Sequence, residues 1–140
     1  MIKNKLKAPN FKLLSTGDKE IELNKLKSKY IVLYFYPKDD TPGCTLETKD
    51  FNKLLNKFKK EDCLIFGISK DNIKSHEKFK KKYSVKFDLL ADEDKKVMKT
   101  YKVWAKKKFM GREFMGTVRS TYLIDNNKKI LNSWTNVKAL

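Results

Sequence analysis

The stretch Tyr30–Glu47, YIVLYFYPKDDTPGCTLE, decides the fold. It opens with an unbroken apolar and aromatic run to Tyr36, which is typical of a strand buried on both faces of a parallel sheet. Pro37 ends that run. Thr41-Pro42 then pairs a favoured N-cap residue with a proline at the first helical position, and apolar residues follow at helical spacing. The stretch therefore predicts a strand followed by a helix from Pro42 to about Lys59.

Cys44 falls in the first turn of the predicted helix, at the carboxyl end of the strand. A helix start favours the thiolate form of a cysteine and gathers free backbone N–H groups. The amides of Gly43 and Cys44 are placed to hold a substrate oxygen, and the glycine leaves the approach open. The polar turn Asp39–Thr41 predicts that solvent reaches the thiol. A buried, inert cysteine is the alternative, but this position favours a reactive one.

Length and composition restrict the class of protein. The chain has 140 residues and is 40% hydrophobic, which predicts one folded domain over residues 1–140 rather than disorder. No apolar run approaches the length of a membrane span, and residues 1–14 lack a signal-peptide core. We therefore expect a cytoplasmic protein without membrane association.

The charge and the cysteine count exclude further classes. The net charge is +16, but only two of the 33 basic residues are arginines, and the lysines are spread along the chain. Solvated lysine faces explain this charge more simply than a dedicated nucleic-acid site does. The two cysteines, Cys44 and Cys63, form neither a disulfide scaffold nor a pattern with metal-ligand spacing, so we expect no metal and no other cofactor.

The rest of the chain predicts a thioredoxin-like fold, in which a central mixed sheet carries helices on both faces and begins with an N-terminal β-hairpin. Residues 104–116 mix lysines with apolar residues, and we interpret them as a mobile or partly extended loop. The other predicted elements are a hairpin of 11–14 and 20–23, strands at 30–36 and 63–69, a helix through 73–83 capped by Asp71-Asn72, an apolar segment at 87–90, a helix at 94–101, and strands at 117–125 and 129–135.

Three side chains besides Cys44 are candidates for the site, each with a structural alternative. Thr41 either caps the helix or donates to the thiolate or substrate. Arg119, within a predicted strand, either forms an ordinary ion pair with Glu47 or keeps Cys44 ionised and binds a polar substrate. His76 suggests a general base, but it lies among apolar residues of another predicted helix, which favours a structural role.

The run from Pro37 to Cys44, PKDDTPGC, carries the PxxxTxxC signature of peroxiredoxins. Together with SHEKF at 75–79 and VRSTYLID at 118–125, it resembles the bacterioferritin comigratory protein (peroxiredoxin Q) branch, from about Ala8 to Trp134. The resemblance implies an antioxidant peroxidase that reduces hydrogen peroxide and organic hydroperoxides. By position, Cys44 is the peroxidatic nucleophile, Thr41 and Arg119 activate it, Pro37 shields the pocket and Glu47 orients Arg119.

The chain departs from the family in two respects. Many members carry a resolving cysteine five residues after the nucleophile or in the next helix; here Lys49 stands at the first place and residues 72–83 contain no cysteine. Members also usually continue into a terminal helix, which this chain apparently lacks, so we expect residues 134–140 to be poorly anchored. Cys63, the only other thiol, opens an apolar strand, and a predicted helix of about 25 Å separates it from Cys44.

The sequence thus predicts a monothiol peroxidase with no intramolecular resolving cysteine. We expect a sulfenic acid at Cys44 and an external reductant, either thioredoxin or a glutathione/glutaredoxin system, in a monomer or weak dimer. A thioredoxin-like binding module that has lost catalysis is an alternative, disfavoured by the complete set of Pro37, Thr41, Cys44 and Arg119. A nucleic-acid-binding protein is a third possibility, which a salt-dependent gel shift would test.

Overall fold

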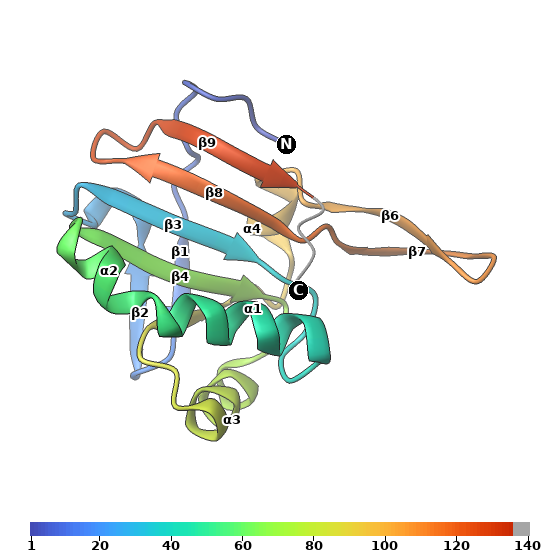
Figure 1. The fold of residues 1–140 in the computed structure, drawn as a ribbon. Helices are drawn as coiled ribbons and strands as arrows, with labels where there is room; N and C mark the ends of the chain where they lie inside the picture. The colour runs from blue at the N-terminus through green and yellow to red at the C-terminus, as the bar shows by residue number, and fades with distance from the viewer. Residues whose placement is uncertain (136–140) are drawn as a thin grey trace.

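The computed structural model describes residues 1–135 of the chain. A seven-stranded mixed sheet is flanked by helices, and a separate two-stranded arm projects from it (Figure 1). The strands are β1 Lys12–Ser15, β2 Lys19–Glu22, β3 Tyr30–Phe35, β4 Cys63–Ser69, β5 Asp88–Ala91, β6 Trp104–Phe109, β7 Arg112–Thr117, β8 Ser120–Asp125 and β9 Ile130–Thr135; the helices are α1 Pro42–Lys53, α2 Leu55–Lys60, α3 Ile73–Tyr83 and α4 Lys96–Thr100, with a 3-10 turn at Leu23–Lys25. The sheet order is β2-β1-β5-β4-β3-β8-β9, and β6 and β7 form the arm.

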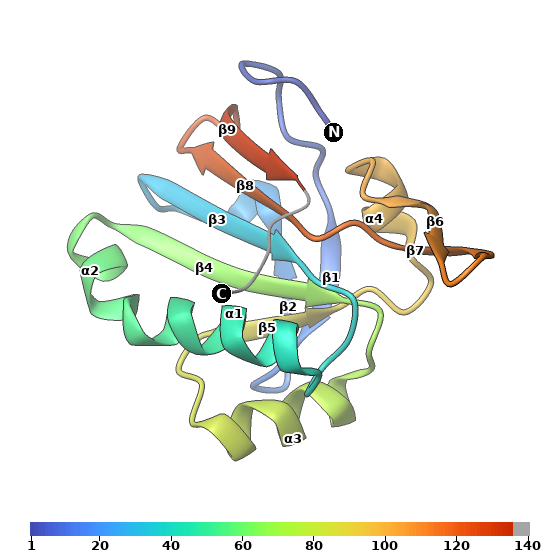
Figure 2. The same ribbon diagram turned by 45° about the vertical axis from the view of Figure 1, so that its right-hand side comes forward.

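Strand β3 lies at the centre of the sheet, parallel to β4 and antiparallel to β8. Its side chains alternate between two cores, as the period of a strand requires. Ile31, Leu33 and Phe35 pack on one side with residues of α4. Val32 and Tyr34 pack on the other with residues of α1, α2 and α3. Figures 1 and 2 show α4 behind the sheet and the other helices in front of it, which confirms the predicted thioredoxin-like architecture with helices on both faces.

A close approach between β4 and β3 helps to fix α1 over the sheet. Gly67 of β4 has no side chain, and a Cβ there would lie 2.7 Å from the Tyr34 hydroxyl and 2.8 Å from Leu89. The space left by Gly67 admits the Tyr34 ring, whose hydroxyl forms a 2.9 Å hydrogen bond with Thr48 of α1. Thr48 lies one turn beyond Cys44. The start of α1 is therefore held at the carboxyl end of β3.

The predicted helix from Pro42 to Lys59 is interrupted. Leu54, with φ −94° and ψ 2°, separates α1 from α2, although its N–H still bonds to the carbonyl of Asp50. The kink leaves Leu54 41% exposed while Leu55 is 6% exposed. Helical periodicity alone placed both leucines on the buried face. The helix predicted at 94–101 is also shorter, because α4 spans only Lys96–Thr100.

The prediction of a loop at residues 104–116 is wrong, because β6 and β7 pair along their whole length from Trp104–Thr117 to Phe109–Arg112. Their two-residue turn consists of Met110 and Gly111, with φ values of 51° and 79°. Positive φ at both turn positions matches the twist of a tight hairpin, and Met-Gly is a weaker signal for it than Asn-Gly. At the C-terminal end, Trp134 of β9 pairs with Thr121 of β8, so Trp134 is anchored. Residues 136–140 lie outside the described part of the chain.

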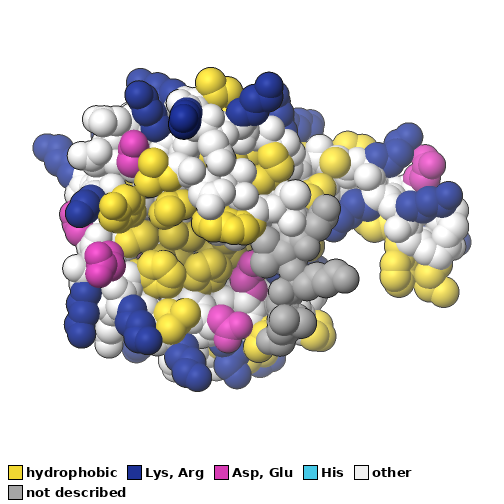
Figure 3. Space-filling model, turned by 45° about the horizontal axis from the view of Figure 1, so that its top comes forward, with side chains coloured by type: hydrophobic (Ala, Val, Ile, Leu, Met, Phe, Trp, Pro, Cys, Tyr) yellow, Lys and Arg dark blue, Asp and Glu magenta, His cyan; other side chains and the backbone are white. Residues whose placement is uncertain are grey.

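Apolar and charged side chains are distributed differently over the surface. Figure 3 shows hydrophobic side chains gathered on one face, with lysine and arginine side chains spread around its margin. A shallow apolar depression is lined by Val32, Phe51, Phe58, Thr121, Leu123 and Trp134. No helix within residues 1–135 combines the length and apolar character needed to span a membrane.

Candidate active site

Cys44 is the third residue of α1 and is buried, with 1% of its surface exposed. The expectation that the polar turn before it brings solvent to the thiol is wrong. Asp39 of that turn is itself 7% exposed, because its carboxylate bonds to Tyr36, just after β3, and to Ser75 and His76 of α3. A reagent that reacts with Cys44 must therefore be small, or the loop must move.

Arg119 reaches Cys44 from a part of the chain 75 residues away. It occupies the two-residue connection between β7 and β8, not a strand as the sequence predicted. Because β8 runs antiparallel to β3 with Ser120 opposite Phe35, the start of β8 lies beside the end of β3. The Arg119 Nη2 donates to the Cys44 sulfur at 3.1 Å, and Nη1 donates to Glu47 Oε1 at 2.7 Å.

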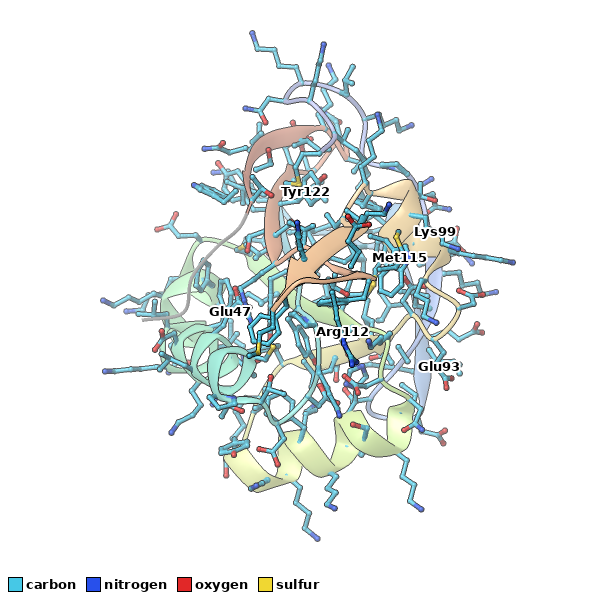
Figure 4. The ribbon with its side chains drawn as sticks, turned by 90° about the vertical axis from the view of Figure 1, so that its right-hand side faces the viewer. Glu47, Glu93, Lys99, Arg112, Met115 and Tyr122 are labelled. Atoms are coloured by element: carbon cyan, nitrogen blue, oxygen red, sulfur yellow. The ribbon has the colours of Figure 1, made fainter. Side chains whose placement is uncertain are left out.

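The same three side chains form a largely buried group of interacting charges. The Arg119 side chain is 16% exposed and that of Glu47 6%. Burial disfavours the charged guanidinium, but the negative charges of Cys44 and Glu47 outweigh it and raise the pKa of Arg119. Burial also raises the pKa of Glu47, and the Arg119 charge only partly opposes this. Figure 4 labels Glu47, which lies on α1. Arg119 therefore remains a cation directed at sulfur.

Thr41 occupies the N-cap position, but its side chain does not cap the helix. Its hydroxyl instead donates to the carbonyl of Lys38 at 2.9 Å. The structure therefore shows neither side-chain capping by Thr41 nor donation from its hydroxyl to the Cys44 sulfur. Pro42 has no N–H, so the Gly43 and Cys44 amides are the first donors at this helix end. Pro37, half-buried, follows β3 and begins the loop.

Gly43 brings the backbone close to Arg119. A Cβ at this position would lie 3.2 Å from Nη2, the nitrogen that contacts Cys44. A side chain here would therefore press on the guanidinium. The glycine does more than leave an open approach, because it allows the close contact between the helix start and the arginine.

Lys107 of β6 is a further cation near the site, and the sequence analysis missed it by assigning its segment to a loop. Burial and the charge of Arg119 lower the pKa of Lys107, whereas Cys44 acts in the opposite direction. Its side chain lies over Gly116, where an added Cβ would approach the lysine Cδ to 2.9 Å. The β6–β7 arm therefore brings a second cation close enough to interact with Arg119 and Cys44.

Cys63 and His76 lie apart from the sulfur. Cys63 begins β4 opposite Tyr30, the first residue of β3, whereas Cys44 follows the far end of β3. Six strand residues rise about 20 Å. Burial raises the pKa of Cys63 to about 11, with the charge of Asp62 contributing. His76 is fully buried and contacts Asp39, not Cys44.

A cysteine sulfur that accepts a hydrogen bond from a guanidinium, beside the first amides of a helix, is suited to attack one oxygen of a peroxide, which places the chain in the class of thiol peroxidases. Within residues 1–135, no cluster of three or more His, Cys, Asp or Glu side chains is arranged to hold a metal ion.

Comparison with known proteins agrees with this class. The AhpC/TSA family matches residues 5–133, so the chain belongs to that family. A putative peroxiredoxin bcp of Helicobacter pylori is 46% identical over 132 residues, covering 94% of this chain and 87% of the relative. Peroxiredoxin Bcp of Bacillus subtilis is 44% identical over 133 residues, covering 95% and 85%.

Solved structures similar to this chain include members of the peroxiredoxin Q branch. Peroxiredoxin Q of Xylella fastidiosa, in a cysteine-to-serine mutant, superposes with a TM-score of 0.93 at 32% identity, covering 100% of this chain and 89% of that one. A bacterioferritin comigratory protein of Xanthomonas campestris, described for its alkyl peroxide reduction activity, has a TM-score of 0.87 at 36% identity and covers 92% and 82%. The predicted resemblance to the peroxiredoxin Q branch is confirmed.

Proposed function

We propose that Cys44 is the peroxidatic residue of this thiol peroxidase, and that its substrates are hydrogen peroxide and alkyl hydroperoxides. The observation that carries the assignment is the 3.1 Å contact between Arg119 Nη2 and the Cys44 sulfur, with Glu47 holding the other guanidinium nitrogen. The second cysteine lacks this environment, since Cys63 is a buried strand residue whose pKa is raised. The alkyl peroxide activity described for the Xanthomonas relative supports the substrate class.

In the proposed chemistry, a lone pair of the Cys44 thiolate attacks the nearer peroxide oxygen and the O–O bond breaks. The other oxygen leaves with the bonding electrons and takes a proton, giving water or an alcohol, while sulfur is oxidised by two electrons to a sulfenic acid. The amides of Gly43 and Cys44, left uncapped by Thr41, and the Arg119 cation lie where charge develops on the peroxide oxygens. In this proposal Pro37, half-buried at the start of the loop, shields the pocket, and Thr41, whose hydroxyl donates to the Lys38 carbonyl, lies at the start of α1.

The sulfenic acid is returned to the thiol by an external reductant. One thiol forms a mixed disulfide with Cys44 and releases water, and a second thiol frees Cys44 while the two reductant sulfurs become a disulfide. Thioredoxin or a glutathione/glutaredoxin system supplies these thiols in the proposal. The roughly 20 Å between the opposite ends of β3 argues against Cys63 as the resolving residue, because a disulfide needs Cα atoms within about 7 Å.

Steady-state peroxide consumption tests this function. Wild type, Cys44→Ser and Cys63→Ser are assayed with hydrogen peroxide and an alkyl hydroperoxide, with thioredoxin or glutathione plus glutaredoxin supplied separately. We expect Cys44→Ser to abolish turnover and Cys63→Ser to retain most of it with at least one reductant. Equal losses in the two variants would show that Cys63 has a redox role and would overturn the monothiol assignment.

A further inference from the structure

The loop that carries Cys44 is tied to the rest of the molecule by a buried cluster around Asp39. Its carboxylate accepts hydrogen bonds from Tyr36 at 2.5 Å and from Ser75 at 2.8 Å, and its Oδ2 lies 2.7 Å from His76 Nδ1. The Asp39 backbone N–H donates to Asp71 at 2.8 Å. The side chains of His76 and Asp39 are 0% and 4% exposed. Five residues before Cys44, the loop is thus joined to α3.

The hydrogen-bond partners fix the number of protons on this pair. His76 Nε2 lies 2.9 Å from the carbonyl of Leu90, which can only accept, so Nε2 carries a hydrogen. One more hydrogen must lie between Nδ1 and Asp39 Oδ2. Tyr36 and Ser75 both donate to the same carboxylate, so this hydrogen completes a set of hydrogen bonds that ties the ring to Asp39.

The groups around the pair are consistent with these hydrogen bonds. Burial, followed by the neighbouring Tyr34 and Asp39, raises the pKa of Tyr36 well above its usual range, so Tyr36 remains a donor. Asp71 faces the backbone of Asp39 rather than its carboxylate, and accepts from Ser69 as well. Within residues 1–135, no buried polar side-chain atom lacks a partner. Removing either residue of the pair would leave the other buried without its hydrogen-bond partner, which is strongly destabilising locally.

We propose that Asp39 and His76 are positioning residues for Cys44. The buried pair holds the loop between β3 and α1 in the conformation in which the sulfur is enclosed and touches Arg119. This inference rests on Cys44 being the reactive cysteine. His76 is then neither a general base nor an incidental core residue: it joins α3, through Asp39, to the start of α1. Loss of the pair lets the loop open, which exposes sulfur and removes it from the guanidinium.

The test uses two readouts that move in opposite directions, in a Cys63→Ser background where Cys44 is the only thiol. One is the rate of Cys44 alkylation by iodoacetamide under native conditions, which reports opening of the loop. The other is the rate constant for oxidation by hydrogen peroxide, which needs the closed loop. For Asp39→Ala and His76→Gln we expect alkylation at least tenfold faster and peroxide oxidation at least tenfold slower.

Isosteric variants separate positioning from a general loss of stability. Asn at 76 keeps a donor at the Nδ1 position, so His76→Asn should lie closer to wild type than His76→Gln, which keeps only the Leu90 contact. Asp39→Asn keeps the shape of the side chain and should partly rescue both rates relative to Asp39→Ala. Val97→Ala, a truncation in the core on the other face of the sheet, should leave the ratio of the two rates unchanged.

Imidazole NMR gives an independent check, because His76 is the only histidine in the chain. We expect a slowly exchanging Nε2–H signal, held by the Leu90 carbonyl, in protein labelled at histidine nitrogen. A rapidly exchanging Nε2–H, or wild-type alkylation and peroxide rates in both Asp39→Ala and His76→Gln, would overturn the proposal. If the Cys63→Ser protein itself fails to react with peroxide, the proposed function fails, while the alkylation rates still decide whether the pair positions Cys44.

Discussion

Replacing Arg119 should slow the reaction with peroxide, because it removes the cation that donates to the Cys44 sulfur. Arg119 is the only side chain within residues 1–135 that donates to the Cys44 sulfur, at 3.1 Å. A hydrogen bond to a charged group contributes about 1.5–3 kcal/mol, and about 1.4 kcal/mol corresponds to a tenfold change in rate. Arg119→Ala should therefore reduce kcat/KM for peroxide by about ten- to 150-fold. The kcat/KM of Arg119→Lys should lie between those of wild type and Arg119→Ala, because a lysine ammonium cannot reach the Cys44 sulfur and Glu47 at the same time, as the two guanidinium nitrogens do.

The assay is the pre-steady-state oxidation of reduced protein by hydrogen peroxide, followed by tryptophan fluorescence or by quenched-flow mass measurement. Lys108→Ala is the matched control, because it removes one positive charge from the exposed arm and makes no contact with the site. It should change the rate by less than twofold at physiological salt, where exposed charges are largely screened. An Arg119→Ala rate within threefold of wild type, in protein that is still folded, would refute the electrostatic reasoning.

Three further changes give distinct expected results. Gly43→Ala should preserve or raise the melting temperature, because alanine is the better helix former by about 1 kcal/mol. The same substitution should slow peroxide oxidation severalfold, because the added Cβ would press on the Arg119 guanidinium at 3.2 Å; an unchanged rate would show that the contact is unimportant. In Cys44→Ser protein, Cys63 should resist iodoacetamide at pH 8 until denaturant is added, because burial raises its pKa to about 11; prompt labelling of the native protein would contradict this. Burial opposes ionisation of Asp88, but its bonds to Lys19, Thr16 and Lys80 lower its pKa, so its stabilisation of the fold is present above the unfolded carboxylate pKa of about 3.9 and is lost as the pH falls further. Urea unfolding should show wild type more stable than Asp88→Asn at neutral pH and equal to it in strong acid. A difference in stability that persists in acid would be inconsistent with the pairing.

The strong local signals of the sequence predicted most of the fold. The apolar runs of β3 and β4, the Thr41-Pro42 helix start and the Asn72 cap, which accepts from the Ser75 N–H at 2.8 Å, all appear where the sequence places them. The arm could not be predicted this way. Its two strands bury little apolar surface, and its Met-Gly turn is a weak signal for a hairpin.

The site was predicted only where motif spacing specifies it. Spacing placed Cys44 at the helix start, and the resemblance associated Arg119 and Glu47 with it, which the structure also brings together. Contacts between distant segments had no local signal. The Asp39–His76 pair spans 37 residues, and a polar residue in a DD turn is normally exposed. Its burial depends on α3 packing against the loop, which no local pattern reports.

The central claim is that Cys44 alone is oxidised by peroxide and that the oxidised form persists until an external thiol arrives. Reduced wild-type protein is treated with one equivalent of hydrogen peroxide, trapped with dimedone, and analysed by intact mass and non-reducing peptide mapping. We predict one dimedone adduct, located on Cys44, with Cys63 unmodified. A prompt disulfide between Cys44 and Cys63 within the monomer, or an adduct on Cys63, would contradict the account.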